Sequence, residues 1–351
     1  MSGASQRDEP AALRDEDAFD TDAVHEWLTS TVDGLAGPPT VKQYPGGASN
    51  LTYLLSYPDR ELILRRPPKG HKAASAHDMR REYTVQKQLK PVYPYVPTVL
   101  ALCTDPDVIG SDFYVMDRID GIILRGDLPE DMTLSPNEAS SLAYRVFDRL
   151  IELHEVDPEA AGLTGLGKGA GYVERQVRGW SDRYRKARTP DSPDAEAVMA
   201  WLRENQPDDV RTCVIHNDFR FDNVVLDDDL TVVGVLDWEM ATLGDPLMDL
   251  AGSLAYWIQA DDDETAMAAR RQPSHVPGMP KRHELVAYYC DRMGISAENW
   301  LFYDVFGAFR LAVIMQQIYY RFHSGQTHNP AFANLATFVS YLLDRCARKI
   351  K

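Results

Sequence analysis

Cysteine is scarce in this sequence of 351 residues. The four cysteines, Cys103, Cys213, Cys290 and Cys346, lie far apart and form neither a CxxC pair nor the spacing of a metal site. No stretch near the N-terminus has the pattern of a signal peptide. We therefore expect a protein of the reducing cytoplasm, in which each cysteine is a small buried side chain rather than a nucleophile.

Positive charge is also in short supply. The chain has 37 Lys and Arg residues against 53 Asp and Glu residues, which gives a formal net charge of −16. Such a charge repels nucleic acids and anionic membrane surfaces, and no apolar run approaches the length of a membrane span. We expect neither a nucleic-acid partner nor a membrane partner, and the sequence leaves the oligomeric state open.

Apolar residues are abundant, at 44% of the chain, and are enough for a large core divided between two lobes. Residues 1–36 are predicted to form an acidic tail with a short helix. Residues 37–119 contain five strand-like runs and one main helical run, which predicts a β-rich N-lobe. Residues 120–351 have mostly helical periodicity and predict a helical C-lobe. The expected fold class is α+β.

One hairpin in the C-lobe gathers polar residues. In the stretch "VIHNDFRFDNVVL" (214–226), two short apolar runs of strand type enclose the polar residues. The second of them, "VVL" (224–226), is joined by a short turn to a further apolar run, "TVVGVL" (231–236). Asn223 and Asp237 then emerge at the same open end of the hairpin, with Asp218 at its edge. Carboxylate and amide oxygens suit Mg²⁺, so we predict that Asn223 and Asp237 bind this metal.

The spacing from Asp218 to Asn223 is the spacing that phosphoryl transfer needs from a catalytic loop. An Asp orients a substrate hydroxyl and accepts its proton, and an Asn five residues later holds the metal. His216 fits as an orienting residue packed beneath the loop. We therefore assign Asp218 and His216 to the catalytic site.

Two motifs, "HNDFRFDN" and "LDWEMATLGDPLMDLA", resemble those of the aminoglycoside phosphotransferase and choline kinase-like family. The resemblance extends more weakly over residues 40–325. It implies a two-lobed, protein-kinase-like fold and transfer of a phosphate from ATP to a hydroxyl group of a small molecule. Family members usually carry glycine where this chain has Asn217, a change that can shift the loop.

Details elsewhere look closest to the subgroup related to the phosphotransferase domains fused to acyl-CoA dehydrogenases. They are "RELILRRPPKG", "REYTVQKQL" and "RQVRGW". This resemblance implies a hydroxylated acyl compound or another metabolite as the acceptor. The sequence does not choose among a hydroxyacyl compound, an aminoglycoside, a sugar and a choline-like alcohol. ATP is the expected donor, with GTP not excluded.

The N-lobe supplies the expected nucleotide site. A turn between two strands contains Gly46, Gly47, Ser49 and Asn50, whose backbone and side-chain donors can approach phosphate oxygens, although such turns are also common in plain hairpins.

Arg65 matches the strand cation that family members, usually with lysine, aim at the α and β phosphates. Arg66 is its rival for this role, and Glu82 in the following helix is the expected partner of the cation. The resemblance also implies that backbone groups from Asp117 to Ile119 bind adenine, with Met116 behind them.

The remaining polar residues have plainer interpretations. Only seven residues separate Asp237 from Asp245, so there is no long activation loop for a polypeptide acceptor. Asp245 and Asp249 begin a helix, where carboxylates cap backbone N–H groups. His154, at the end of another helix, is interpreted as a packed residue. Several helix residues either cover the substrate or are ordinary helix faces: Arg175, Gln176, Trp180, Arg310, Gln316, Gln317 and Arg321.

Two other functions remain open from the sequence. A catalytically silent nucleotide-binding module would share the same residues, and only turnover would distinguish it. A metal-dependent phosphohydrolase could use His216, Asp218 and Asp237, but it would normally need histidines closer together than the nine scattered ones found here.

Overall fold

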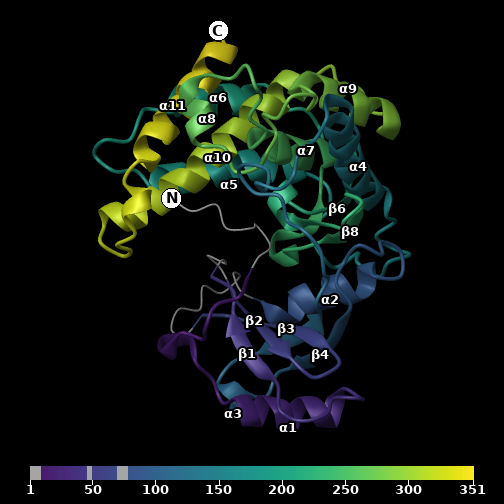
Figure 1. The fold of residues 1–351 in the computed structure, drawn as a ribbon. Coiled ribbons are helices and arrows are strands. Elements are labelled where there is room, and N and C mark those ends of the chain that lie inside the picture. Colours follow the sequence, from purple (N-terminus) through teal and green to yellow (C-terminus); the bar gives the residue numbers. More distant parts are fainter. Residues whose placement is uncertain (1–8, 46–49, 69–77) are drawn as a thin grey trace.

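The structure, a computed structural model, describes residues 9–45, 50–68 and 78–351, and it has a β-rich lobe and a larger helical lobe (Figure 1). The β-rich lobe contains an antiparallel five-stranded sheet with the order β1-β2-β3-β5-β4. Its strands are β1 (Thr40–Gln43), β2 (Leu51–Ser56), β3 (Glu61–Arg66), β4 (Val99–Cys103) and β5 (Phe113–Asp117).

Both faces of this sheet are covered. Successive side chains of a strand point to opposite faces, so Leu62 and Leu64 of β3 pack in one apolar cluster with α1 (Thr21–Thr31), whereas Ile63 packs in a second cluster that includes the first residue of α2 (Met79–Leu89). The short helix α3 (Pro106–Ile109) contacts α1. The same alternation places Arg65 and Arg66 on opposite faces of the sheet.

The N-cap of helix α1 is Asp20 rather than Asp22. The Asp20 carboxylate accepts hydrogen bonds from the main-chain N–H groups of Asp22 and Ala23. Either aspartate is a suitable cap by residue type, and only the backbone conformation decides between them.

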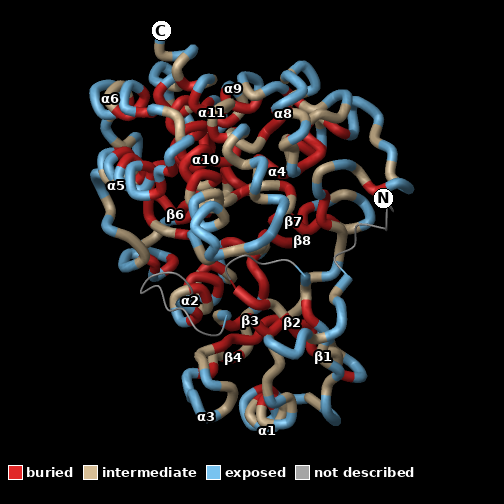
Figure 2. Tube along the Cα trace, turned by 90° about the vertical axis from the view of Figure 1, so that its left-hand side faces the viewer, coloured by how far each residue is buried: buried red, intermediate tan, exposed pale blue. Residues whose placement is uncertain are grey.

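The helical lobe is built around α10, which is buried along most of its length (Figure 2). By length and composition this helix could cross a membrane, which the sequence analysis did not anticipate, but 72% of its most apolar window is buried inside the protein. The helices of this lobe are α4 (Pro136–Glu155), α5 (Tyr172–Lys186), α6 (Glu196–Glu204), α7 (Pro246–Ala255), α8 (Glu264–Ala268), α9 (Arg282–Met293), α10 (Trp300–His323) and α11 (Leu335–Lys349).

Four short strands lie in the helical lobe beside the β-rich lobe. The pairs are β6 (Cys213–Ile215) with β9 (Thr242–Gly244), and β7 (Val224–Leu226) with β8 (Val232–Val235). The sequence pattern indicated three of them and missed β9, which has only three residues and therefore too few for a periodicity to show. The β6–β9 pair fixes the two ends of the segment that contains the polar hairpin.

The division of the chain at residues 36/37 and 119/120 stays a prediction. The two lobes are visibly separate in Figure 1, but Val85 and Leu89 at the end of α2 pack in the large apolar cluster of the helical lobe. Helix α2 therefore joins the core of one lobe to the sheet of the other.

Candidate active site

The β7–β8 hairpin brings Asn223 and Asp237 together. Val224 pairs with Val235 in this antiparallel ladder, and the main-chain N–H of Leu236 donates to the carbonyl oxygen of Asn223 at 2.8 Å. The strand residues Val224 and Val235 are fully buried, so the apolar hairpin anchors two polar residues at its open end. The adjacency predicted from the hairpin is confirmed, while metal binding by the pair stays a prediction.

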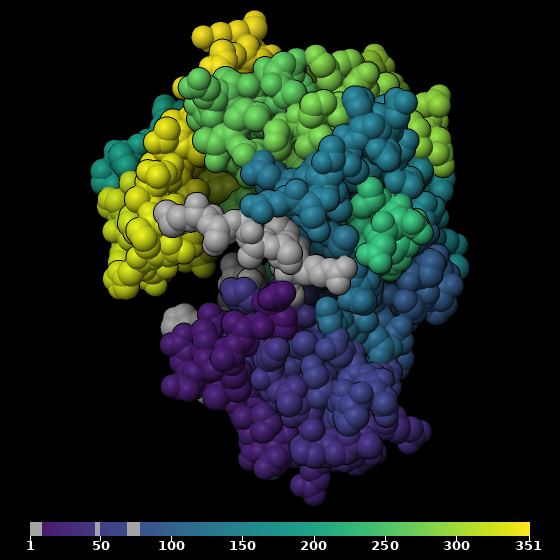
Figure 3. All heavy atoms as spheres, in the orientation of Figure 1, coloured from purple at the N-terminus to yellow at the C-terminus, as the bar shows by residue number. Residues whose placement is uncertain are grey.

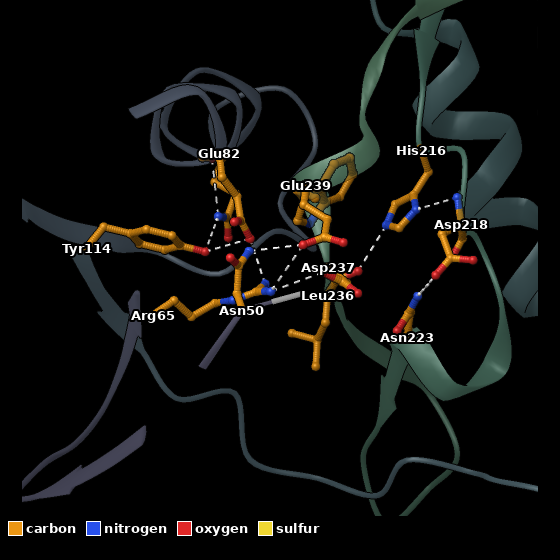
Figure 4. Close-up of polar contacts among 12 residues, drawn as sticks. Asn50, Arg65, Glu82, Tyr114, His216, Asp218, Asn223, Leu236, Asp237 and Glu239 are labelled. Atoms are coloured by element: carbon orange, nitrogen blue, oxygen red, sulfur yellow. Dashed lines mark hydrogen bonds and ion pairs between the residues drawn. The ribbon is translucent and has the colours of Figure 1, made fainter. Parts of the chain in front are cut away.

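Asp237 turns the chain sharply as it leaves β8. Its φ is +68°, in the left-handed region, and a short 3-10 helix (Trp238–Met240) follows. This turn directs the carboxylate toward the β-rich lobe, where Oδ1 of Asp237 lies 3.2 Å from Nη2 of Arg65 (Figure 4). Aspartate tolerates this backbone conformation better than most residues, so the local sequence permits the turn.

His216 is buried beneath the loop that contains Asp218. Its Nε2 lies 2.9 Å from the carbonyl oxygen of Leu236, so Nε2 carries the proton and donates it. Its Nδ1 then accepts a hydrogen bond from the main-chain N–H of Asp218 at 3.2 Å. The side chain is wholly buried, so His216 contacts the loop and the end of β8 rather than the cavity, as an orienting residue would.

Asp218 lines the cavity, and one of its two carboxylate oxygens is hydrogen-bonded within the loop. Oδ2 accepts hydrogen bonds from Nη2 of Arg220 at 3.1 Å and from Nδ2 of Asn223 at 3.2 Å, and Asn223 also donates to the Asp218 main-chain carbonyl at 2.8 Å. These contacts hold Oδ2, whereas Oδ1 has no hydrogen-bond partner among the described residues. They also commit the side-chain nitrogen of Asn223, so its side-chain oxygen is the atom left for a further contact.

Arg220 is a part of the site that the sequence analysis did not assign. Its guanidinium also lies 3.3 Å from Asp222 and stacks over the ring of Tyr256 at 4.5 Å. Burial alone would lower the pKa of Arg220, but the carboxylates of Asp218 and Asp222 raise it overall, so the group is a permanent cation. Its place two residues after Asp218, on the same loop, is the signal that could have found it.

Asp249 anchors the same loop from below. Its two oxygens accept the main-chain N–H groups of His216 at 2.7 Å and of Asn217 at 2.8 Å, and its Oδ2 also contacts Nε2 of His154 at 3.1 Å. Burial alone would raise the pKa of Asp249, but the contacts with His154 and His216 lower it below the usual value. Asp245 caps α7 as expected, and His154 is packed as expected. Asp249 is also a scaffolding residue, but it binds the main-chain N–H groups of the loop instead of those at the start of its own helix.

The β-rich lobe contributes a buried ion pair. Nη1 of Arg65 lies 2.6 Å from Glu82 of α2, and the hydroxyl of Tyr114 donates to the same carboxylate oxygen at 2.8 Å (Figure 4). Burial disfavours the charged form of Arg65, but Glu82, Asp237 and Glu239 raise its pKa overall. The predicted partnership of Arg65 with Glu82 is confirmed.

Arg66 faces the other side of the sheet. Its guanidinium donates to the hydroxyl of Tyr53 at 3.1 Å and to the carbonyl oxygen of Asp17, and the side chain is buried there. Arg65, in contrast, lines the cavity between the lobes. Of the two rivals, only Arg65 lies where a nucleotide phosphate could reach it.

The glycine-containing turn can be followed only in part. Gly46, Gly47 and Ser49 lie outside the described residues. Asn50 is described, and its Nδ2 donates to Oε2 of Glu239 at 3.0 Å, which ties the end of this turn to the segment after Asp237. Glu239, another residue that the sequence analysis did not assign, lies 4.0 Å from Arg65.

The residues expected near adenine line the cavity, but their main-chain donors are not equivalent. Met116, Asp117 and Ile119 all border it. The N–H of Asp117 donates to Thr98 at 2.9 Å and that of Arg118 to Glu61 at 3.3 Å. Among the described contacts, the N–H of Ile119 is therefore the one left for a base.

A single cavity contains the predicted residues from both lobes. It has a volume of about 1440 Å³ and opens into the hollow seen between the lobes in Figure 3. Its walls include Arg65 from the sheet, Asp218 and Asn223 from the loop, and Asp237. The helices α5 and α10 complete the wall opposite the sheet, through Trp180, Arg183, Lys186, Arg310, Ile314, Gln317 and Arg321.

Replacing Arg65 by alanine should weaken nucleotide binding and destabilise the fold. The substitution leaves the Glu82 carboxylate buried without its cation, which typically costs about 3–5 kcal/mol. Arg65→Lys should retain part of the affinity, since an ammonium can still pair with Glu82 but cannot also reach Asp237. Nucleotide affinity would be measured by calorimetry, and thermal unfolding would report stability.

Two further variants separate these effects. The double variant Arg65→Ala with Glu82→Gln removes the unpaired charge and should recover stability without recovering nucleotide affinity. Arg66→Lys, on the opposite face of the sheet, should bind nucleotide as the unmodified protein does. Unchanged affinity in Arg65→Ala would rule out a phosphate-binding role for this side chain.

Comparison with known proteins gives a consistent result. The model of a family described as the phosphotransferase enzyme family matches residues 40–285. The chain is 37% identical to acyl-CoA dehydrogenase family member 10 of Mus musculus, a match that covers 88% of this chain and 29% of that protein. It is 34% identical to acyl-CoA dehydrogenase family member 11 of Homo sapiens, with 95% and 44% covered. The chain thus spans less than half the length of these curated relatives.

Solved structures agree with the family match. A candidate aminoglycoside phosphotransferase of Ralstonia eutropha is 29% identical with a TM-score of 0.80, and the match covers 95% of this chain and 98% of the other. An aminoglycoside phosphotransferase in ternary complex with AMP-PNP and hygromycin B is 14% identical with a TM-score of 0.59, covering 93% and 98%. The predicted protein-kinase-like α+β fold is confirmed.

Proposed function

The chain belongs to the phosphotransferase enzyme family, and we propose that it transfers the γ-phosphate of ATP, with Mg²⁺, to a hydroxyl group of a small molecule. The observation that carries this proposal is the meeting of Asp218, Asn223 and Asp237 at one hairpin end, opposite Arg65 and within one cavity. ATP is the favoured donor because a structural relative was solved with AMP-PNP. GTP is the alternative donor.

The residues present fit Mg²⁺. The carbonyl oxygen of Asn223 and the carboxylate of Asp237 are hard oxygen donors at the same hairpin end, and one carboxylate with phosphate oxygens is the way proteins commonly hold this ion. In the described part of the chain, no group of three or more His, Cys, Asp or Glu side chains could hold a metal by itself. Bound there, Mg²⁺ would neutralise charge on the nucleotide phosphates.

The chain's own residues would then perform the positioning. Arg65, held by Glu82, would bind the phosphates from the sheet side, and Asp218 would orient the acceptor hydroxyl through Oδ1 while Arg220 and Asn223 hold Oδ2. Catalysis of phosphoryl transfer consists largely of such positioning and of charge stabilisation. His216 would act by supporting the loop.

The part of the cavity wall formed by α5 and α10, which we call the acceptor wall, is cationic even though the whole protein is acidic. Arg183 and Lys186 of α5, with Arg310 and Arg321 of α10, line the cavity, and these two helices contribute no acidic residue to the lining. No carboxylate pairs with any of the four cations among the described residues. A polycationic acceptor, such as an aminoglycoside, would be repelled by this wall, whereas an anionic acceptor would be attracted.

The positions of these cations along α5 and α10 also indicate how long the acceptor should be. They run side by side away from the catalytic loop, because Arg310 stacks on Trp180 at 5.3 Å and Gln316 donates to the carbonyl oxygen of Ala187 at 2.9 Å. With a rise of about 1.5 Å per residue, Lys186 lies about 9 Å beyond Trp180 and Arg321 about 16 Å beyond Arg310. Ile314 and Ile318 line the intervening stretch.

The acceptor proposed is therefore a hydroxylated acyl compound with an anionic group, either a carboxylate or a phosphate, at the end away from the hydroxyl. Its hydroxyl would meet Asp218, its apolar chain would lie along Ile314 and Ile318, and its anionic group would reach Lys186 and Arg321. We also propose a reducing, cytoplasmic setting, since the four cysteines are buried free thiols.

Transfer assays with radiolabelled ATP and Mg²⁺ would test this proposal against a panel of acceptors. The panel contains a free hydroxy fatty acid, the same acid esterified to a phosphate-bearing carrier, an aminoglycoside, choline and a sugar. Product with one of the first two supports the proposal and identifies the anionic group. Product only with the aminoglycoside or choline would contradict it. Nucleotide binding without transfer to any acceptor would favour the catalytically silent module.

Charge reversal at the outer wall should raise the KM for the anionic acceptor. The double variant Lys186→Glu with Arg321→Glu should raise it about tenfold, because each exposed charge contact contributes up to about 1 kcal/mol. Nucleotide affinity should not change. Arg178→Glu, an exposed position of α5 that does not line the cavity, is the matched control. An unchanged KM in the double variant would show that these cations do not bind the acceptor.

A further inference from the structure

Asn217 occupies a backbone conformation that glycine adopts more easily. Its φ is +68°, a value at which a side chain carries a steric cost that glycine does not pay. The main chain of Asn217 is fixed on both sides: its N–H donates to Asp249 at 2.8 Å, and its carbonyl oxygen accepts from Nη2 of Arg310 at 2.7 Å. Neither of these two bonds involves the Asn217 side chain, so glycine at this position could make both.

The side chain adds two bonds that glycine could not make. Oδ1 of Asn217 accepts from the hydroxyl of Tyr172 at 3.0 Å, and Nδ2 donates to the carbonyl oxygen of Met240 at 3.0 Å. A main-chain carbonyl only accepts hydrogen bonds, so the amide orientation is determined by Met240. The Asn217 side chain is therefore a bridge between two segments far apart in the sequence.

Both segments belong to the cavity. Tyr172 is the first residue of α5, which carries Trp180 and Arg183 on the acceptor wall. Met240 ends the 3-10 helix that starts directly after Asp237, and it lines the cavity itself. The residue that follows Asn217 is Asp218. The bridge thus connects the start of the acceptor-side helix to the metal-side segment, and it passes through the peptide that carries the proposed catalytic carboxylate.

The buried end of the bridge is rigid. Tyr172 is 5% exposed, its ring lies so close to Gly244 of β9 that a Cβ there would be 2.9 Å from it, and its main-chain N–H donates to Asp209 at 2.8 Å. Because Tyr172 is tightly packed, a displacement of Asn217 should be passed on to the start of α5 rather than be taken up by movement of the tyrosine ring.

We propose that Asn217 is a positioning residue that couples the nucleotide side of the site to the acceptor side. When Mg²⁺ and nucleotide engage the segment containing Asp237, the Met240–Asn217–Tyr172 bridge fixes the start of α5 and the placement of Asp218. The inference rests on the proposed function, because it presumes that nucleotide binds beside Asp237. This coupling explains why the chain has asparagine, rather than glycine, at position 217, where the backbone conformation favours glycine.

Asn217→Gly is the variant that isolates the bridge. Glycine accepts the backbone conformation and keeps both main-chain bonds, so the fold and the affinity for Mg²⁺ with AMP-PNP should stay within about twofold of the unmodified protein. Hydrogen exchange would be measured with and without Mg²⁺ and AMP-PNP. In the unmodified protein, the nucleotide should slow exchange in residues 237–241 and in residues 172–187. In Asn217→Gly the first protection should remain and the second should be lost.

Transfer should change in the same variant. With the best acceptor of the panel, kcat should fall about tenfold, as expected from the loss of two hydrogen bonds of ordinary strength. Tyr172→Phe removes one of the two bonds and keeps the ring, so it should show a partial loss of both effects. Asn205→Gly, at the exposed end of α6, is the matched control and should show neither.

The outcomes separate this inference from the proposed function. If the unmodified protein does not bind Mg²⁺ with AMP-PNP, the proposed function fails and the coupling fails with it. If it binds, but Asn217→Gly keeps both its protection of 172–187 and its kcat, the coupling is overturned and the proposed function stands. Should Asn217→Gly not fold, Tyr172→Phe decides in the same way, and a pattern identical to that of the unmodified protein would overturn the coupling.

Discussion

Asp218→Asn is expected to lower the rate of phosphate transfer at least about 100-fold while leaving nucleotide affinity unchanged. The amide oxygen can still accept from Arg220 and Asn223, which hold Oδ2 of Asp218 at 3.1 and 3.2 Å, so the loop should keep its shape. The group facing the acceptor, however, can no longer accept a proton. General-base assistance is typically worth about 10² to 10⁴ in rate. The measurement is kcat for transfer, with AMP-PNP affinity measured in parallel.

Asp227→Asn is the control for this substitution. Asp227 lies at the far end of the same hairpin, where its carboxylate accepts from the main-chain N–H groups of Asp229 and Thr231, as an asparagine side chain also can. Its kcat should match that of the unmodified protein. A transfer rate for Asp218→Asn within a few-fold of normal, with nucleotide binding intact, would show that Asp218 does not orient the acceptor.

Asp237→Asn should abolish the dependence of nucleotide affinity on Mg²⁺. It should also lower kcat/KM at least about 100-fold, because removing one electrostatic contact to the transition state typically lowers the rate by about this factor. Asparagine tolerates the left-handed backbone at this position, where φ is +68°, so the fold should be retained. The measurement is AMP-PNP affinity during titration with Mg²⁺, which should be steep for the unmodified protein and flat for the variant.

Glu239→Gln is the matched control for Asp237. It neutralises a carboxylate only two residues away that lies 4.0 Å from Arg65 and accepts from Asn50 at 3.0 Å. The glutamine can keep the contact with Asn50, so a smaller loss is expected and the Mg²⁺ dependence should persist. If the Mg²⁺ titration of Asp237→Asn resembled that of the unmodified protein, the metal would have to be assigned to other residues.

The hairpin end could be predicted from the sequence because its geometry is local. Two apolar runs joined by a short turn can pair in few ways, and the pairing of Val224 with Val235 places Asn223 beside the start of the Asp237 turn. The pairing of Arg65 with Glu82 was predicted from family resemblance and is confirmed at 2.6 Å. These relations depend on strand register and on one helix, which sequence patterns report well.

The choice between Arg65 and Arg66 needed the tertiary structure. Strand alternation shows that neighbouring residues point to opposite faces, but it does not show which face α1 covers. In the structure, Arg66 faces the α1 side and contacts Tyr53, whereas Arg65 faces the cavity. Both arginines have the same local sequence environment, so the pattern alone could not separate them.

Side-chain contacts across the site could not be predicted from the sequence for a similar reason. The contacts of Asn217 with Tyr172 and Met240 join residues 45 and 23 positions apart along the chain. The cationic wall depends on the side-by-side packing of α5 and α10, whose residues are ordinary helix positions when read singly. Such contacts follow from how helices pack against a loop, and no periodicity encodes them.

Phosphorus NMR of the purified protein with ATP, Mg²⁺ and a hydroxylated acyl acceptor is the most direct test of the proposed phosphate transfer. The γ-phosphate signal of ATP should decline as a phosphate-ester signal of the acceptor grows in equal amount, and Asp218→Asn should show neither change. Release of inorganic phosphate alone, or an ester signal that persists in Asp218→Asn, would contradict this proposal.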